Sequence, residues 1–156
     1  MEARTPGAKR AGPGEHVFDM HKVNQIMGGP AYSPVFGGCV EGERMIVALM
    51  RYPAGQPSDA HSHPNEQWIY VLEGELEMEF DGKWFRGGPG NVFYVPANKV
   101  HKARNDGAKD CVFFTCKDAS HGLHGTKAGL HGTKAGLHGT KAGLHGTKAG
   151  LHGKKA

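Results

Sequence analysis

Long apolar segments are missing from this sequence. No run approaches the ~18 to 20 apolar residues that a membrane-spanning helix needs, and the N-terminal stretch MEARTPGAKRAGPGEH has no apolar signal core. We therefore expect a cytoplasmic protein without a membrane partner.

Cysteines are scarce as well. Cys39, Cys111 and Cys116 are odd in number, and none of them lies in a C-x-x-C pair. Cys111 and Cys116 are five positions apart, so on one strand they would face opposite sides and could not pair with each other. The sequence thus predicts reduced thiols without a function of their own.

Acidic residues are absent after Asp118. Residues 1–118 hold 13 Lys/Arg and 15 Asp/Glu, whereas residues 119–156 hold six lysines and no acid. The net charge of +4 therefore comes from the C-terminal part, and the preceding part is slightly acidic. Because a nucleic-acid-binding domain carries its positive charge on a folded face, we expect no nucleic-acid partner beyond weak binding through the basic tail.

Long helical patterns are also lacking. After a flexible N-terminal segment, residues 1–14, short apolar or alternating runs are separated by turn residues, which is typical of an all-β sandwich or barrel. The stretch FDGK, with Asp81 and Gly82 between two alternating runs, predicts a hairpin. The expected strands are RMIVALMRY from Arg44, EQWIYVLEG from Glu66, ELEMEF from Glu75, KWFR from Lys83, VFYVP from Val92, HKARN from His101 and CVFFTC from Cys111.

The C-terminal part is a heptapeptide repeat. LHGTKAG begins at Leu123, Leu130, Leu137 and Leu144, and the chain closes with LHGKKA. Each unit has two glycines and one large apolar residue, whereas a coiled coil needs two apolar positions per heptad. We therefore predict a disordered tail over residues 119–156, whose removal after Asp118 leaves the core activity intact.

Candidate metal ligands lie in two segments. His61 and His63 are two positions apart, so on a strand they face the same side, and Gln67 keeps that parity if no bulge intervenes. His101 lies on a much later predicted strand. Three imidazoles and an amide oxygen that converge in a barrel suit one divalent ion, with Zn, Fe, Ni and Mn all acceptable.

The spacing of these residues resembles that of the cupin family. Gly55, His61, His63, Gln67 and Gly74 follow its first motif, with glutamine where the family has glutamate. Its second motif is matched by Gly90, Pro96, His101 and Asn105, with Asn98 in place of a glycine. The resemblance implies that residues 15–118 form a single cupin jelly-roll β-barrel that holds a divalent metal and acts on a small-molecule substrate.

Gln67 limits the kinds of reaction that the expected metal site could catalyse. An amide neither offsets the charge of a divalent ion nor carries a proton, so the bound ion would be a stronger Lewis acid. This favours an isomerase, lyase or cyclase acting on a sugar-acid or keto/enol substrate. By resemblance, three-histidine, one-glutamine cupins include enzymes of unsaturated uronates and, more loosely, aromatic polyketide cyclases. Two alternatives remain open, an Fe(II)-dependent cupin dioxygenase and a non-catalytic ligand-binding module.

Two further residues are weaker catalytic candidates. Glu66 adjoins Gln67, and a bulge there would turn its carboxylate toward the metal, although strand parity favours an outward position. Arg51 would be an anion clamp if its side chain pointed into the barrel. A homodimer is also expected, because a single jelly roll leaves a sheet face or edge that a second copy can cover.

Overall fold

Residues 2–130 are described by a computed structural model, and they contain thirteen strands and one short helix. The elements are β1 (Lys9–Arg10), β2 (Gln25–Gly29), β3 (Ser33–Glu41), β4 (Met45–Tyr52), β5 (Gln56–Pro57), β6 (His61–Ser62), β7 (Gln67–Glu73), β8 (Leu76–Phe80), β9 (Lys83–Gly87), β10 (Val92–Val95), β11 (Lys102–Asn105), β12 (Cys111–Asp118), β13 (Thr126–Lys127) and the 3-10 helix η1 (Ala128–Leu130). The prediction of an all-β fold is confirmed.

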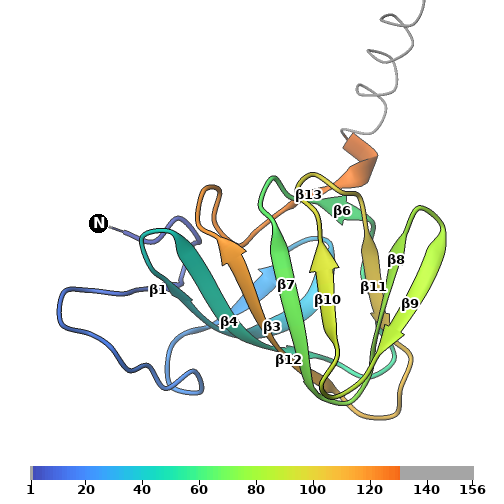
Figure 1. The fold of residues 1–156 in the computed structure, drawn as a ribbon, viewed down its shortest axis with the longest axis horizontal. Helices are drawn as coiled ribbons and strands as arrows, with labels where there is room; N and C mark the ends of the chain where they lie inside the picture. The colour runs from blue at the N-terminus through green and yellow to red at the C-terminus, as the bar shows by residue number, and fades with distance from the viewer. Residues whose placement is uncertain (1, 131–156) are drawn as a thin grey trace, which may run out of the picture.

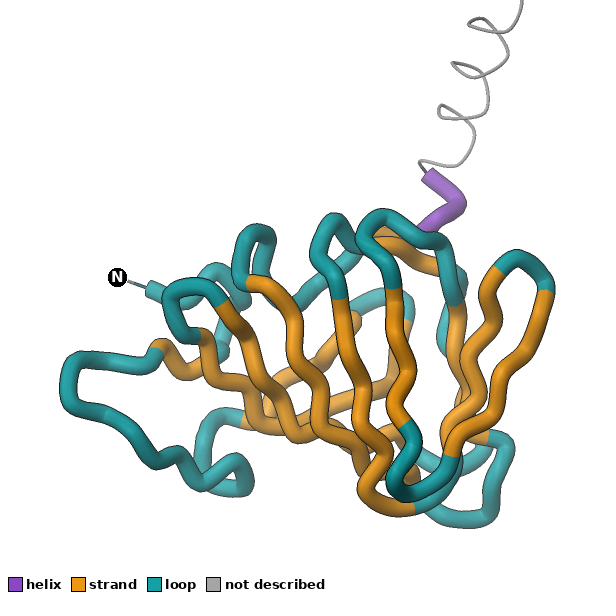
Figure 2. Tube along the Cα trace, viewed as in Figure 1, coloured by secondary structure: helices purple, strands orange, loops and turns teal. Residues whose placement is uncertain are grey.

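The strands form two main sheets that face each other as a jelly roll (Figure 1). The larger sheet has the order β1-β3-β4-β12-β7-β10, with β2 paired to β3, and the smaller has the order β5-β11-β8-β9. A third, two-stranded sheet of β13 and β6 lies at the upper rim of the barrel in Figure 1. Many of the loops gather at the two rims (Figure 2). Within residues 2–130 no helix is long and apolar enough to cross a membrane.

The core lies between the two main sheets and follows a period of two. In β4, Ile46, Ala48, Met50 and Tyr52 are at most 2% exposed, while the residues between them are not buried. Because successive side chains on a strand point to opposite faces, alternation of this kind buries one face and leaves the other outside. Two of the cysteines, Cys39 and Cys111, are buried here, and all three cysteines are free thiols, as predicted.

The FDGK hairpin is confirmed. Phe80 pairs with Lys83, and the two residues between them, Asp81 and Gly82, have φ angles of 53° and 80°. Positive φ at both central positions is the requirement of a type I′ turn, whose twist matches that of the flanking strands. Asp-Gly satisfies this requirement at low cost because both residues tolerate the left-handed region.

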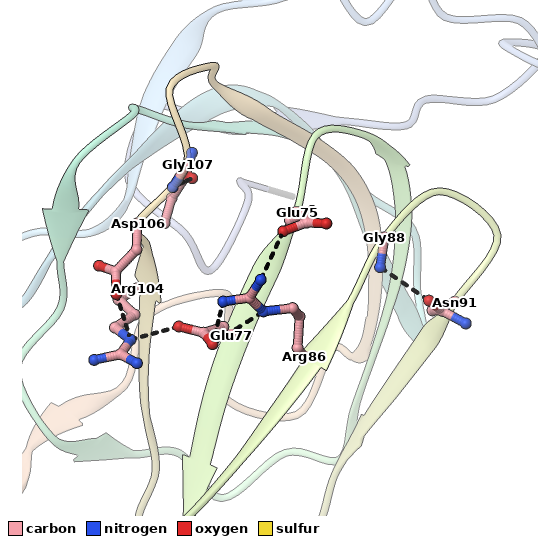
Figure 3. A network of polar contacts seen from close by, with 9 residues as sticks. Glu75, Glu77, Arg86, Gly88, Asn91, Arg104, Asp106 and Gly107 are labelled. Atoms are coloured by element: carbon pink, nitrogen blue, oxygen red, sulfur yellow. Dashed lines mark hydrogen bonds and ion pairs between the residues drawn. The ribbon is translucent and has the colours of Figure 1, made fainter.

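Charged residues cover the outer face of the smaller sheet (Figure 3). Arg104 Nε donates to Glu77 Oε2 at 2.6 Å, and Arg86 bonds both Glu77 at 3.1 Å and Glu75 at 3.3 Å. The hydrogen bonds from Arg104, which has the largest effect, and from Arg86 lower the pKa of Glu77. The glutamates of this strand therefore form a solvated, ion-paired face and not a catalytic cluster, as the alternation in the sequence indicates.

The N-terminal segment is part of the fold, which corrects the prediction for residues 1–14. Glu41 is completely buried, and its carboxylate accepts hydrogen bonds from the backbone N–H of Arg4 at 2.6 Å and from the N–H and hydroxyl of Thr5. β1 then pairs in parallel with β3. Composition did not reveal this, because the segment is held mainly through its backbone and one buried carboxylate, with Ala8 as its one apolar side chain packed against the core.

The first repeat unit also belongs to the fold, so the predicted boundary at Asp118 is wrong. Ala119 and Leu123 are 2% and 3% exposed within the core, and β13 pairs with β6. Lys117 Nζ donates to Leu123 O at 2.8 Å. A single leucine per unit is enough here because an existing core receives it. The later units, residues 131–156, lie outside the described residues.

Truncation after Asp118 should therefore destabilise the domain. Compared with a chain that ends at Leu130, we expect a loss of roughly 3 to 6 kcal/mol of unfolding free energy, from the lost burial of Leu123 and the polar groups left unpaired. Urea unfolding followed by tryptophan fluorescence measures this difference. Equal midpoints for the two chains would show that the first unit contributes nothing.

Candidate metal centre

Three histidines meet at the rim of the barrel. His61 begins β6, and His101 lies just before β11, where the two residues form an antiparallel bridge. Each backbone N–H donates to the other's carbonyl at 2.9 Å. His63 follows β6 directly and is 2% exposed. This arrangement is consistent with the prediction from the sequence that the three histidines lie together. The bridge joins the segment of His61 and His63 to the segment of His101.

The three imidazoles are closely spaced. The ring centroids of His61 and His101 are 4.3 Å apart, those of His63 and His101 are 5.0 Å apart, and those of His61 and His63 are 6.3 Å apart. Tyr32 stacks on His61 at 4.2 Å. The rings therefore face one small region, with an aromatic side chain against one side of it.

Each imidazole is oriented by a backbone carbonyl two residues away. The Nδ1 atom of His61 lies 2.9 Å from Asp59 O, that of His63 lies 2.8 Å from Asn65 O, and that of His101 lies 2.8 Å from Lys99 O. A carbonyl accepts but does not donate, so Nδ1 carries the proton in all three rings and Nε2 keeps its lone pair. Metal-binding histidines are usually fixed by such a second hydrogen bond.

The histidines are neutral at pH 7. Burial lowers the pKa of His61 and of His63 to about 4, and that of His101 to about 3. The nearby amine of Lys117 acts in the same direction on all three. Neutral imidazole is the form that binds a metal ion, so these rings need not lose a proton on binding.

Gln67 is oriented by a hydroxyl. Its Nε2 donates to Thr115 Oγ1 at 2.8 Å, and that hydroxyl donates to Trp68 O at 2.8 Å. A hydroxyl has one proton, so Thr115 can only accept from position 67 while it donates to Trp68. The amide nitrogen is thereby held on Thr115 and the amide oxygen remains available. A glutamate at this position would have no proton to give and would compete for that of Thr115.

The donor set fits a divalent ion, although the side chains are not arranged as ligands. Within residues 2–130, no group of three or more His, Cys, Asp or Glu side chains has the spacing of a metal site. His63 Nε2 is nevertheless buried and has no hydrogen-bond partner. A buried lone pair without a partner is costly, and a metal ion would satisfy it.

A cavity of about 60 Å³, open to solvent, extends from His61 and His101 into the barrel. His61, His101 and Gln67 lie among its polar lining residues. Its remaining lining residues are mainly apolar, and none of them is Arg, Lys, Asp or Glu; they are Ser33, Val35, Tyr52, Ser58, Ile69, Leu76, Met78, Ala103 and Phe113. Three of the four candidate ligands, all but His63, therefore border a cavity that suits a small, largely apolar group.

The two weaker catalytic candidates do not face this cavity. Glu66 is exposed and accepts a hydrogen bond from Tyr94 at 2.5 Å. Arg51 points to the outer side of the larger sheet and pairs with Asp110 at 3.3 Å. Strand parity predicts the outward position of Glu66, and the same alternation explains that of Arg51, because Met50 and Tyr52 on either side are buried.

Two buried residues near the site were not predicted. Asn65 is fully buried, and its amide donates to the carbonyls of Asp118 at 2.7 Å and Gly122 at 3.0 Å. Lys117 is 4% exposed, and burial lowers its pKa to about 7. Lys117 carried a signal, since it continues the inward phase of β12 after Phe113 and Thr115. Asn65 had none, because it lies in the spacer between His63 and Gln67.

The chain is similar to cupin proteins in both sequence and structure. A model of the cupin domain matches residues 48–116. The polyketide synthase CurC of Streptomyces cyaneus is 34% identical over 79 residues, covering 50% of this chain and 49% of that protein. Quercetin 2,3-dioxygenase of Bacillus subtilis is 36% identical over 64 residues, covering 40% of this chain and 19% of that protein.

Among solved structures, the cupin domain of Schizosaccharomyces pombe Cnp3 superposes with a TM-score of 0.54 at 18% identity. The match covers 64% of this chain and 70% of that chain, and it shows the fold. The chain spans about half of the length of CurC and about a fifth of that of the dioxygenase.

The lowered histidine pKa values predict acid lability. An unfolded histidine titrates near 6.5, so below that pH the unfolded chain takes up protons that the folded His61, His63 and His101 do not accept until about pH 4, 4 and 3. Stability is therefore present above pH 6.5 and is lost as pH falls, with a slope approaching about 4 kcal/mol per pH unit for three groups.

Urea unfolding in the presence of a chelator, repeated at intervals from pH 7.5 to 5, measures this slope. Because one titrating group is removed, His101→Gln should reduce the slope by roughly one third. A stability that stays constant between pH 6.5 and 5 would contradict the burial of neutral histidines.

Proposed function

Because the chain contains a small cupin jelly-roll domain, we propose that it binds one divalent metal ion and uses it as a Lewis acid on a small keto or enol substrate. The reaction class is an isomerisation, elimination or cyclisation. The proposed ligands are three imidazole Nε2 atoms and one amide oxygen, from His61, His63, His101 and Gln67.

The observation that supports this most is the common orientation of the three histidines. Each Nδ1 is held by a backbone carbonyl, so each Nε2 is left without a proton. One of these atoms, in His63, is buried without any partner. Three neutral imidazoles in this arrangement contribute little to the stability of the fold, because a buried acceptor without a donor costs free energy. A bound metal ion would give these acceptors a partner, which is why the arrangement supports metal binding.

The glutamine decides the kind of chemistry. A metal ion held by four neutral ligands keeps its full charge and would polarise a carbonyl or enol oxygen of the substrate. Gln67 cannot accept a proton at its amide, and its nitrogen is occupied by Thr115. The described ligands therefore orient and hold, and they do not supply the base that a glutamate would.

The cavity favours a keto or enol substrate over a sugar acid. A uronate would need a cation for its carboxylate and several partners for its hydroxyl groups. The lining offers neither Arg nor Lys and is largely apolar beyond the histidines. A molecule with an apolar body and one oxygen-bearing end suits this lining. The name of the related CurC, a polyketide synthase, is compatible with such a substrate.

An Fe(II)-dependent dioxygenase is the second candidate. It is favoured by the similarity to quercetin 2,3-dioxygenase, which shares 36% identity over 64 residues. The outward position of Glu66 argues against a carboxylate ligand from this segment. The two functions differ in a measurable way, since a dioxygenase consumes oxygen and a Lewis-acid isomerase or lyase does not.

Turnover with simultaneous oxygen measurement tests the proposal. The chain is loaded separately with Zn, Mn, Ni and Fe and offered aromatic diketones, enolisable polyketides and unsaturated uronates. We expect turnover of a keto or enol compound without oxygen uptake. His101→Ala should lower the rate by roughly a hundredfold or more, since Lewis-acid stabilisation is worth several kcal/mol. Glu66→Gln, on the outer face, should retain activity.

Oxygen uptake in proportion to product would replace this proposal by the dioxygenase. Thermal stabilisation by one of these compounds without any turnover would identify a ligand-binding module instead.

We also propose that two copies associate through the outer face of the larger sheet. Trp68 is 49% exposed, and its ring packs against that of Tyr94 with the centroids 4.6 Å apart. Tyr70 lies between Val92 and Phe114 in the next cross-strand row. At roughly 200 Å² per large side chain, these five leave about 400 to 500 Å² of apolar surface. That is the size of the largest patches on monomers and a little over half of the ~800 Å² per partner of stable dimers, so the rest of the interface would come from the polar residues around this patch.

A charge placed at the centre of this face should dissociate the dimer. We expect light scattering to give about twice 16.7 kDa for the wild type and the single value for Tyr70→Lys. Val17→Lys is a matched control, because Val17 is 92% exposed and lies outside the sheets. A wild type that stays monomeric at millimolar concentration would rule out this interface.

A further inference from the structure

The first heptapeptide unit occupies a defined docking slot on the domain. Taken one residue earlier than the LHGTKAG unit that begins at Leu123, the docked unit is Gly122–Ala128, with the sequence GLHGTKA. The slot lies at the rim that carries β6 (Figure 1) and is formed by Thr5, Tyr32, residues 59–62, Asn65 and Lys117.

The first half of the unit is held by its backbone and one leucine. Leu123 is 3% exposed in the core, its N–H donates to Thr5 Oγ1 at 2.7 Å, and its carbonyl accepts from Lys117 Nζ at 2.8 Å. Gly122 has a φ angle of +75° and accepts from Asn65 at 3.0 Å. A glycine and a leucine are therefore both required at these two positions.

The second half of the unit fits equally closely. A Cβ on Gly125 would lie 2.5 Å from the carbonyl oxygen of Ser62, and the N–H of Gly125 donates to the Tyr32 hydroxyl at 2.7 Å. Lys127 pairs with Asp59 at 2.7 Å, and the N–H of Ala128 donates to Ala60 O at 2.9 Å. Thr126 is exposed, so its side chain is the least constrained of the unit.

The contacting residues recur without change downstream. GLHGTKA is repeated from Gly129, Gly136 and Gly143, and the last copy, from Gly150, differs by a lysine in place of the exposed threonine. We propose that the docking slot is a receptor for this heptapeptide, and that downstream units of the same chain replace the first one in it.

The length of the intervening loop sets the balance between the units. Ala119 is fixed by the hydrogen bond from its N–H to Arg44 O at 2.8 Å, and Ser120 and His121 now connect it to the unit. Docking of the second unit lengthens this connection to residues 120–128. A loop about four times longer lowers the population roughly tenfold. The first unit therefore occupies the docking slot in most molecules, and the downstream units occupy it when the first unit cannot bind.

The docked unit contacts the segment that carries one of the candidate metal ligands, His61. Lys127 lies opposite His61 in the β13–β6 pair, and Asp59 both binds the Lys127 amine and accepts from His61 Nδ1 through its backbone. The docked unit thus covers the strand that carries this histidine. Exchange among identical units keeps the strand covered when the docked unit is chemically damaged.

Three full-length variants test the exchange. One carries Leu123→Asp, the second carries aspartate at the four downstream leucines, and the third carries all five changes. We expect the thermal midpoint of the second to equal that of the wild type, that of Leu123→Asp to fall by roughly 5 °C, and that of the third to fall by roughly 10 °C or more. Equal midpoints for Leu123→Asp and the five-fold variant would overturn the proposal.

A disulfide trap reports the docked unit directly. Ser62 and Thr126 are paired residues on β6 and β13, close enough for a cross-strand disulfide. In a Cys116→Ser, Leu123→Asp chain, Ser62→Cys with Thr133→Cys should form an intrachain bridge, detected by mass spectrometry of a non-reduced digest. Absence of the bridge would overturn the proposal. A bridge between two chains, or a midpoint that rises with protein concentration, would overturn the intrachain assignment.

Discussion

The antiparallel bridge between His61 and His101 is the contact on which the site depends. Two reciprocal backbone hydrogen bonds of 2.9 Å join the β6 segment to the end of the Pro96–His101 loop. The bridge brings the two imidazoles to 4.3 Å and closes the rim of the barrel. Because the neighbouring carbonyls of Asp59 and Lys99 then hold Nδ1 of each ring, the same backbone geometry sets both position and protonation.

Much of the fold and of the site follows from the sequence. Alternation predicts the strands from Met45 to Lys117 and the burial of one face, and Asp81-Gly82 predicts the hairpin, because these are local consequences of strand geometry. The spacing of the histidines predicts their convergence. The orientation of Gln67 could not be predicted, since it depends on the single proton of Thr115, a residue 48 positions away.

The two ends of the chain show where composition fails. The N-terminal segment and the first repeat unit have the residue content of disordered sequence, yet Thr5 is 1% exposed and Leu123 is 3% exposed. Each binds a polar group that the barrel itself leaves buried, the carboxylate of Glu41 in one case and the amine of Lys117 in the other. Buried charges without partners are costly. Pairing with these two charges therefore holds in place segments that have little tendency to form ordered structure by themselves.

In the proposed metal centre, three histidines and a glutamine hold one divalent ion. Metal content by mass spectrometry tests it most directly, on full-length protein purified without nickel resin after replacement of His131, His138, His145 and His152 by alanine, beside the same chain with His101→Ala. We expect about one Zn, Fe, Ni or Mn per chain, and we expect the His101→Ala chain to have lost it. No metal after incubation with each ion, or metal retained without His101, would contradict it.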